Sequence, residues 1–286
     1  MSDALMQLAF GGLSPRRVDS LLATHGTPEA VVRAVAGGRT SLSEAVVAEI
    51  VVPAAERMAC LDALGVSWES RDTDSYPERL RRFDDAPRWL FVRGSLREGP
   101  SIAIVGTRTC TPYGLELAES YGTVAARSGW IVASGLAKGI DHAAHTGAVS
   151  SGGMCHAVLG SGIDVVYPRR HRPLYDAIIS SGGAMCSEFP PGTRPDAWRF
   201  PTRNRIIAGM ADVVLVVEAG MKGGALITAR IALDYGISVF ASPGDVDRPA
   251  SAGTNALIRD GAFPVFDGED LAQVLDLISP LAAGAA

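Results

Sequence analysis

Cysteine is scarce in this chain, and its four copies lie far apart. They form no Cys-x-x-Cys pair, which argues against a structural zinc site and against a disulfide framework. The sequence has no run of about 18 apolar residues, so it supports no membrane span. The N-terminus lacks a basic region followed by an apolar segment, so we expect no secretion signal and a cytoplasmic location. The cysteines are Cys60, Cys110, Cys155 and Cys186.

Lysine is rarer still, because Lys138 and Lys222 are the two lysines among 26 basic residues. The 31 acidic residues give a net charge of −5, so any basic site must be local. Both lysines lie in glycine-rich loops, where a flexible ammonium beside a bare backbone suits phosphate contact. Chance placement of either lysine in a solvated loop is the alternative.

Residues 1–70 are expected to form a small all-helical domain. Apolar residues recur there at helical spacing, and both Ser14 and Thr27 are N-cap residues followed by proline. Helices joined by the Gly37-Gly38 turn could present backbone amides to a DNA phosphate. A packing or protein-interaction module is the alternative.

Residues 71–278 are expected to form an α/β domain with a Rossmann-like, doubly wound and mostly parallel sheet. Short apolar runs alternate there with amphipathic helical segments, as in parallel sheets covered by helices on both faces. The Ala-rich residues 279–286 are expected to be a flexible tail. The predicted strands are 89–92, 101–105, 130–133, 154–159, 184–188, 212–218 and 237–241.

The loops that follow five of these predicted strands are rich in glycine. In a doubly wound sheet, ligands bind beyond the carboxyl ends of the strands. Glycine lets a phosphate approach the backbone, and helix N-termini add oriented N–H donors. Because Arg108 and Lys138 stand in two of these loops, we predict a site for a polyanion. The loops are 106–108, 134–139, 160–162, 220–224 and 242–244.

Familiar nucleotide and metal motifs do not fit these loops. Glycine follows both lysines where a Walker A loop needs Ser or Thr, and the nearest dinucleotide fingerprint, at 160–165, lacks its third glycine. Asp141, His142 and His145 share one predicted helix without a further clustered ligand. We therefore expect no bound metal and no cofactor.

Positive charge is concentrated in residues 166–205, which carry seven arginines against three acidic residues, a local balance of +4. Aromatic residues are interleaved with the arginines. Arginine holds phosphates and aromatic faces stack bases, a combination typical of single-strand binding. A solvated basic loop with its aromatics in the core is the alternative. The aromatics are Tyr167, Tyr175, Phe189, Trp198 and Phe200.

The same residues resemble the DNA-processing protein A family (DprA, also called Smf). The resemblance covers about residues 74–265, and the N-terminal helices are similar to the helical, SAM-like module that these proteins often carry. The matching motifs, in chain order, are 106–108, 113–114, 134–141, 157–164, 167–168, 187–193, 200–207, 217–218, 226–229, 242–244 and 253–255.

The resemblance implies a non-enzymatic protein that binds single-stranded DNA. It further implies protection of incoming strands in natural transformation, help in loading the recombinase RecA, and a homodimer. Arg108 and Lys138 are then the expected DNA-contacting cations, and the Arg-Asn-Arg segment 203–205 is expected at the same pocket. The expected DNA-binding residues are Gly106, Thr107, Arg108, Ser134, Gly135, Lys138, Phe200, Arg203, Asn204, Arg205, Gly223 and Gly224.

Two departures from the family pattern are visible. The chain has Gly223-Gly224-Ala225 where relatives commonly have Ser-Gly-Ser, which removes two hydroxyls that could meet phosphate. It also ends soon after the predicted sheet, so we expect no C-terminal winged-helix module.

Two other functions remain open from the sequence. A phosphoribohydrolase similar to the LOG family needs a glutamate soon after its glycine-rich loop, but no carboxylate follows Lys222 until Asp234. A nucleotide sensor without catalysis would bind a mononucleotide as well as a long strand. The fold alone does not separate these functions.

Overall fold

A nine-stranded sheet runs through the fold in the order β1-β2-β6-β5-β4-β3-β7-β8-β9. The computed structural model describes residues 2–283. Strand β1 pairs antiparallel with β2, and β2 pairs antiparallel with β6, whereas the other pairings are parallel. The strands are β1 (Ser67–Ser70), β2 (Trp89–Gly94), β3 (Ser101–Val105), β4 (Ile131–Ser134), β5 (Cys155–Val158), β6 (Ala184–Ser187), β7 (Val213–Val216), β8 (Ser238–Ala241) and β9 (Phe263–Pro264).

The direction in which the sheet grows reverses at β3. Strands β4, β5 and β6 follow on one side of β3, and then β7, β8 and β9 follow on the other. The register pairs Val105 with Val216, so β3 and β7 end side by side. Their loops diverge from this point, which makes it the topological switch point where doubly wound sheets bind ligands.

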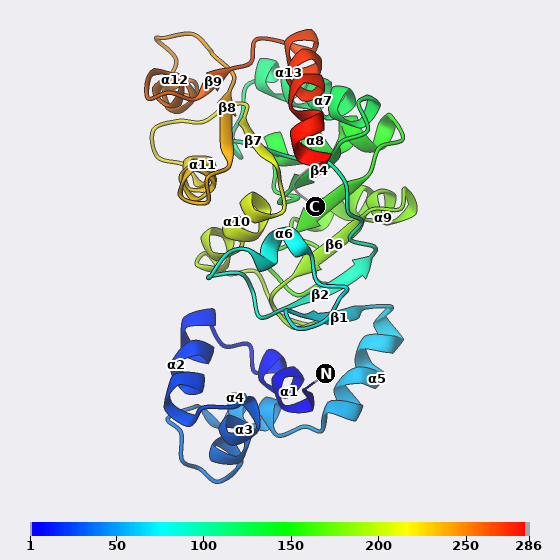
Figure 1. Ribbon diagram of the computed structural model, residues 1–286, viewed down its shortest axis with the longest axis vertical. Helices are drawn as coiled ribbons and strands as arrows, with labels where there is room; N and C mark the ends of the chain where they lie inside the picture. Colours follow the sequence, from blue (N-terminus) through cyan, green and yellow to red (C-terminus); the bar gives the residue numbers. More distant parts are fainter. Residues whose placement is uncertain (1, 284–286) are drawn as a thin grey trace.

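Helices cover both faces of the sheet (Figure 1). Alternate strand residues face opposite cores, so Ile102 and Ile104 lie in one apolar cluster and Ala103 and Val105 in the other. One face carries α7 (Pro112–Arg127), α8 (Ile140–Ser150), α9 (Arg172–Ser180) and α13 (Gly268–Ala283), and the 3₁₀ turn η1 (Arg169–His171) precedes α9. The other face carries α6 (Glu78–Arg81), α10 (Arg199–Gly209) and α11 (Gly224–Asp234), and α12 (Ala252–Arg259) packs beside β8.

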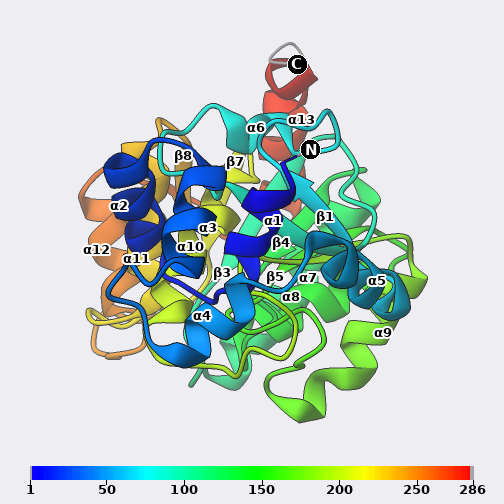
Figure 2. The ribbon, with the colours of Figure 1, turned by 90° about the horizontal axis from the view of Figure 1, so that it is seen from below.

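Five short helices form a unit at the end of the molecule near β1 and β2 (Figures 1 and 2). Thr27 caps α3 by accepting a hydrogen bond from the backbone N–H of Ala30 at 3.2 Å, whereas Ser14 caps α2 without a side-chain bond. Phe10 packs edge-to-face on Phe91 of β2, with ring centroids 5.4 Å apart, so unit and sheet share a core. The helices are α1 (Asp3–Phe10), α2 (Pro15–His25), α3 (Pro28–Ala36), α4 (Glu44–Ile50) and α5 (Ala54–Leu64).

The predicted Rossmann-like, mostly parallel α/β sheet is confirmed, and each of the seven predicted strands overlaps an observed one. Strands β1 and β9 were not predicted, and β1 lies inside the stretch expected to be helical. Residues 279–283, expected in a flexible tail, instead continue helix α13, while 284–286 lie outside the described residues. Within residues 2–283, none of the helices has both the length and the apolar character of a membrane span.

Candidate nucleic-acid interface

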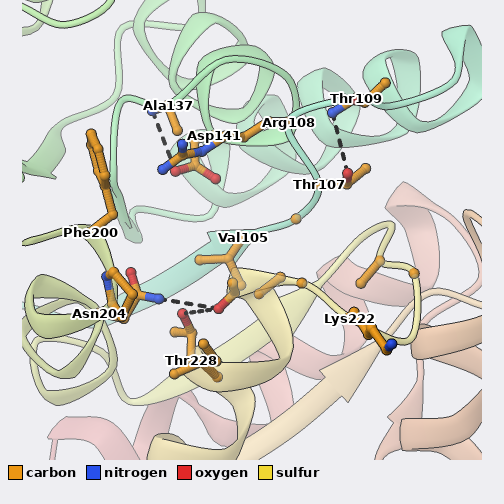
Figure 3. Close-up of a pocket in the computed structure, with 18 of the residues that line it drawn as sticks. Val105, Thr107, Arg108, Thr109, Ala137, Asp141, Phe200, Asn204, Lys222 and Thr228 are labelled. Carbon is orange, nitrogen blue, oxygen red and sulfur yellow. Dashed lines mark hydrogen bonds between the residues drawn. The ribbon is translucent and has the colours of Figure 1, made fainter. Parts of the chain in front are cut away.

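A cavity of about 940 Å³ opens at the switch point between β3 and β7. We call it the switch-point cavity. The loop after β3, the loop after β7 and the start of α10 all contribute to its lining. Figure 3 shows Arg108 and Asp141 on one side of the cavity, Phe200 and Asn204 on another, and Lys222 across from them.

The loop after β3 is fixed by a buried carboxylate. Glu218 accepts hydrogen bonds from the Thr111 hydroxyl at 2.6 Å and from the Thr111 backbone N–H at 3.0 Å. Its own carbonyl accepts from the Thr107 N–H at 2.7 Å. These bonds hold the ends of the loop, and Arg108 stands exposed between them. The cation is thus presented on a pre-organised backbone.

Arg108 lies over an aromatic ring. Its guanidinium carbon is 4.4 Å from the ring centroid of Phe200, a cation–π contact worth about 0.5–1 kcal/mol at an exposed site. Tyr167, which is 46% exposed, lies with its ring centroid 5.8 Å from that of Phe200. Phe200 and Tyr167, which we call the stacking wall, therefore offer aromatic faces beside the Arg108 donor. A base can stack on such a face while its adjacent phosphate contacts the arginine.

Arg203 lies at the buried side of the same cavity. Its Nη2 is 3.6 Å from Asp141 Oδ2 and donates to the Gly135 carbonyl at 3.3 Å, while its buried Nε–H has no partner among the described residues. Burial lowers the pKa of Arg203 and Asp141 opposes that shift, but arginine still carries its charge at neutral pH. Arg203, which lines the cavity, thus keeps a desolvated Nε–H without a partner among the described residues.

Asp141 organises the neighbouring loop as well. Its Oδ2 accepts from the backbone N–H of Gly135 at 3.1 Å. It also accepts from the backbone N–H of Ala137 at 3.4 Å (Figure 3). Between these residues Leu136 is buried with φ at +52°, a left-handed conformation that is uncommon for leucine. The carboxylate therefore helps to hold a strained turn that directs Lys138 outward.

The exposed cations at or beside the cavity that form no ion pair within the described part of the chain include Arg108, Lys138 and Lys222. Asp196 also lines the cavity, but its Oδ2 forms an ion pair with Nη1 of Arg199 at 3.9 Å. The positive charge of the rim is thus uncompensated, which favours an anionic ligand.

Eight of the twelve predicted DNA-binding residues line the switch-point cavity, and Lys138 lines an adjacent one. The eight are Gly106, Thr107, Arg108, Phe200, Arg203, Asn204, Gly223 and Gly224. Asn204 donates to the carbonyl of Gly224 at 3.1 Å, so it ties α10 to the glycine-rich loop (Figure 3). Most of the predicted residues therefore line one cavity, and their contact with DNA stays a prediction.

Three predicted residues do not reach the cavity. Ser134 is fully buried and donates to the Ile104 carbonyl at 2.7 Å. Gly135 gives Arg203 its space, because a Cβ there would lie 1.7 Å from the guanidinium. Arg205 donates to Glu188 Oε1 at 2.7 Å. It lies two residues after Arg203 on helix α10, so its side chain points in a different direction from that of Arg203. These three residues therefore support the site or the fold from outside the cavity lining.

The cavity lining also includes residues outside the predicted set, among them a cation, Lys222, and an exposed aromatic, Tyr167. Both gave a signal: Lys222 is one of two lysines, and Tyr167 is one of the interleaved aromatics. Two other aromatics of that segment, Tyr175 and Phe189, are buried in the core, as the alternative interpretation of the segment expected. Solvent exposure separates Tyr167 from Tyr175 and Phe189, and amino-acid composition does not reveal exposure.

The chain is similar to known proteins over most of its length. A family model described as DNA recombination-mediator protein A matches residues 69–276. Protein Smf of Escherichia coli (strain K12) is 42% identical over 206 residues, which are 71% of this chain and 55% of that protein. The chain thus spans about half the length of that relative.

Two solved structures are also similar. The X-ray structure of DNA processing protein A from Streptococcus pneumoniae superposes with a TM-score of 0.77 and 32% identity, covering 95% of this chain and 97% of that one. A structure described as the single-stranded DNA binding mode of DNA processing protein A from Helicobacter pylori gives a TM-score of 0.66 and 26% identity, covering 73% and 95%.

Proposed function

The chain belongs to the DNA recombination-mediator protein A family, and from that premise we propose that it binds single-stranded DNA in the switch-point cavity. The observation that carries the proposal is Arg108, an exposed and unpaired guanidinium lying 4.4 Å from the ring centroid of Phe200. The relative from Helicobacter pylori, described as binding single-stranded DNA, supports it.

In this proposal, phosphates bind Arg108, Lys222 and the backbone amides of the loops, and a base stacks on Phe200 or Tyr167. Phosphate contacts carry no base identity, so sequence preference is weak. Each neutralised phosphate releases counterions, so affinity falls by about tenfold between about 50 and 200 mM salt for two or three contacts.

Single strands are preferred to duplex for a geometric reason. The stacking faces lie inside a cavity lined by loops and by the start of α10, so a base reaches them only after leaving its own stack. In a duplex, unstacking and unpairing cost a few kcal/mol per base, whereas a flexible single strand has little of this cost.

We also propose that the chain is not an enzyme of the phosphoribohydrolase type. The first carboxylate after the Gly223-Gly224 loop is Asp234, at the far end of the 11-residue helix α11. At 1.5 Å per residue, Asp234 lies about 15 Å along the helix from Gly224. We expect no release of base when the protein is incubated with nucleoside monophosphates.

We further propose the homodimer, the role in natural transformation and the transfer of the strand to RecA that the family resemblance implies. Sedimentation of the purified chain tests the dimer, and co-precipitation of RecA in the presence and absence of oligo-dT tests the transfer. A monomer at micromolar concentration, or no RecA capture, would remove the corresponding part of the proposal.

Fluorescence anisotropy of labelled oligo-dT tests the binding function itself. We expect salt-sensitive binding of the single strand, weak binding of matched duplex, and no displacement by a mononucleotide. Binding of the mononucleotide without binding of oligo-dT would instead indicate a nucleotide sensor.

A further inference from the structure

A second cavity, of about 470 Å³, adjoins the switch-point cavity, and Arg108 and Thr109 line both. We call it the histidine cavity, after His142 of α8 and His171 of η1. Its remaining lining residues include Lys138 and Arg170, and none of its lining residues is a carboxylate. Five nitrogen-bearing basic side chains therefore surround one space: Arg108, Lys138, His142, Arg170 and His171.

The two imidazoles pack against each other in the lining of this cavity, with His171 3% exposed. Their ring centroids are 4.3 Å apart at an interplanar angle of 50°. His171 Nδ1 lies 3.0 Å from the carbonyl oxygen of Leu136. Because a carbonyl only accepts, Nδ1 carries the proton, and in neutral His171 the other nitrogen, Nε2, has no proton to donate. The neutral ring therefore cannot donate from Nε2 to a phosphate oxygen, whereas the protonated ring can.

The surroundings of the pair keep both rings neutral in the absence of an anion. Burial is the largest influence and lowers the pKa of each ring, and Arg170 lowers both further. Asp141 and the Leu136 carbonyl act in the opposite direction on His171.

Four further titratable or charged groups lie around the pair. Lys138 and Arg108 add positive charge from two loops, and the Cys110 thiol, its pKa raised by burial, stays neutral. His145 of α8 also stays neutral, because burial lowers its pKa to about 3. The cavity is therefore positively charged, and its histidines are poised to gain a proton when an anion enters.

We propose that the histidine cavity is a second phosphate subsite for the same single strand, with Lys138, Arg170, His142 and His171 as its anion-binding groups. The proposal rests on the proposed function, because a strand that passes Arg108 presents successive phosphates to the two cavities. Arg108 is the shared boundary, so the subsites form one continuous path.

The proposal predicts that binding takes up protons. A bound phosphate raises the pKa of the two histidines above their values in the free protein. The added affinity is fully present below the free-state pKa values and is lost as pH rises through the bound-state values. Arginine and lysine keep their charges over this range. Burial lowers the pKa of His156 to about 4, so neither His145 nor His156 contributes above about pH 5.5.

The test is anisotropy of labelled oligo-dT from about pH 8 to 5.5 at constant ionic strength. For the wild type we expect affinity to rise by about tenfold as pH falls, the rise that uptake of about one proton allows. The double variant His142→Gln, His171→Asn should show no rise in affinity as pH falls, measured against its own affinity at pH 8. Asn retains the donor for the Leu136 carbonyl, and far-ultraviolet circular dichroism checks the fold.

Two control variants separate the possible causes. His25→Gln, in helix α2 and far from both cavities in sequence, should keep the full pH dependence. Lys222→Gln, on the other rim, should weaken binding by a similar factor at every pH. His142→Gln alone should reduce the rise if the double variant does not fold.

The pH series distinguishes failure of the proposed single-strand binding from failure of the proposed histidine subsite. If the wild type binds no single strand at any pH, the proposed function fails. If the wild type binds equally well at every pH, or if the double variant keeps the rise, the histidine subsite is refuted and the proposed function stands.

Discussion

The arginines of the rim and those of helix α10 carry the same charge but serve different purposes. Arg108 is exposed, unpaired and held on a loop that Glu218 fixes. Arg205 is 9% exposed and donates to Glu188 Oε1 at 2.7 Å. The comparison teaches that a local excess of arginine does not by itself locate a binding site, because Glu188 holds the Arg205 guanidinium in the interior while that of Arg108 faces solvent.

The largest expected effect comes from breaking the buried pair. Arg205→Ala leaves the Glu188 carboxylate buried without its partner, which should cost about 3–5 kcal/mol of the free energy of unfolding. Denaturant titration measures this loss, and the folded fraction should bind oligo-dT as the wild type does. A variant of normal stability that fails to bind would place Arg205 in the interface instead.

Buried histidines should make stability depend on acid. Burial lowers the pKa of His145 to about 3 and that of His156 to about 4, against 6.5 when unfolded. The unfolded chain therefore binds more protons, and stability should fall as pH drops below about 6.5, by about 1.4 kcal/mol per pH unit for each histidine. Denaturant titrations at about pH 7 and pH 5 measure the fall.

This dependence on acid contrasts with the one predicted for the histidine cavity. Lower pH should weaken folding through the core histidines and strengthen DNA binding through His142 and His171. A free energy of unfolding that is unchanged between these pH values would show that His145 and His156 are not held neutral by burial.

A smaller effect is expected at the stacking wall. Phe200→Ala removes the ring under Arg108, and loss of one stacked base costs about 1–3 kcal/mol, or about tenfold in affinity. Phe200→Tyr, which keeps a stacking face, should lose little. Oligo-dT anisotropy distinguishes the two variants, and equal losses in both would argue against stacking at this wall.

Much of the fold follows from local sequence, because parallel strands buried on both faces are apolar throughout. Residues 102–105 show this pattern and are buried in β3. Residues 213–217 also show it and are buried in β7 and in Val217, which follows β7. Strand β1 shows no such run, since its buried Trp68 stands between polar residues. Strand β9 has two residues, one of them Pro264, so its place depends on tertiary contacts.

The site was predictable to the level of its loops but not of each side chain. Glycine and cations after the strands identify the switch point, because sheet topology brings those loops together. The direction of each side chain depends on the turn that carries it. Ser134 and Arg205 belong to the right segments, yet one bonds a strand carbonyl and the other a buried carboxylate.

The most direct test of the central claim compares Arg108→Glu with Arg127→Glu in a salt series of oligo-dT binding. Arg127 is the exposed last residue of α7, the helix that leads away from the loop carrying Arg108, so the two variants change charge equally. We predict that Arg108→Glu lowers affinity by about 100-fold or more and flattens the salt dependence, while Arg127→Glu stays within about twofold of the wild type. If both variants bind like the wild type with the same salt dependence, the strand does not bind at the switch-point cavity.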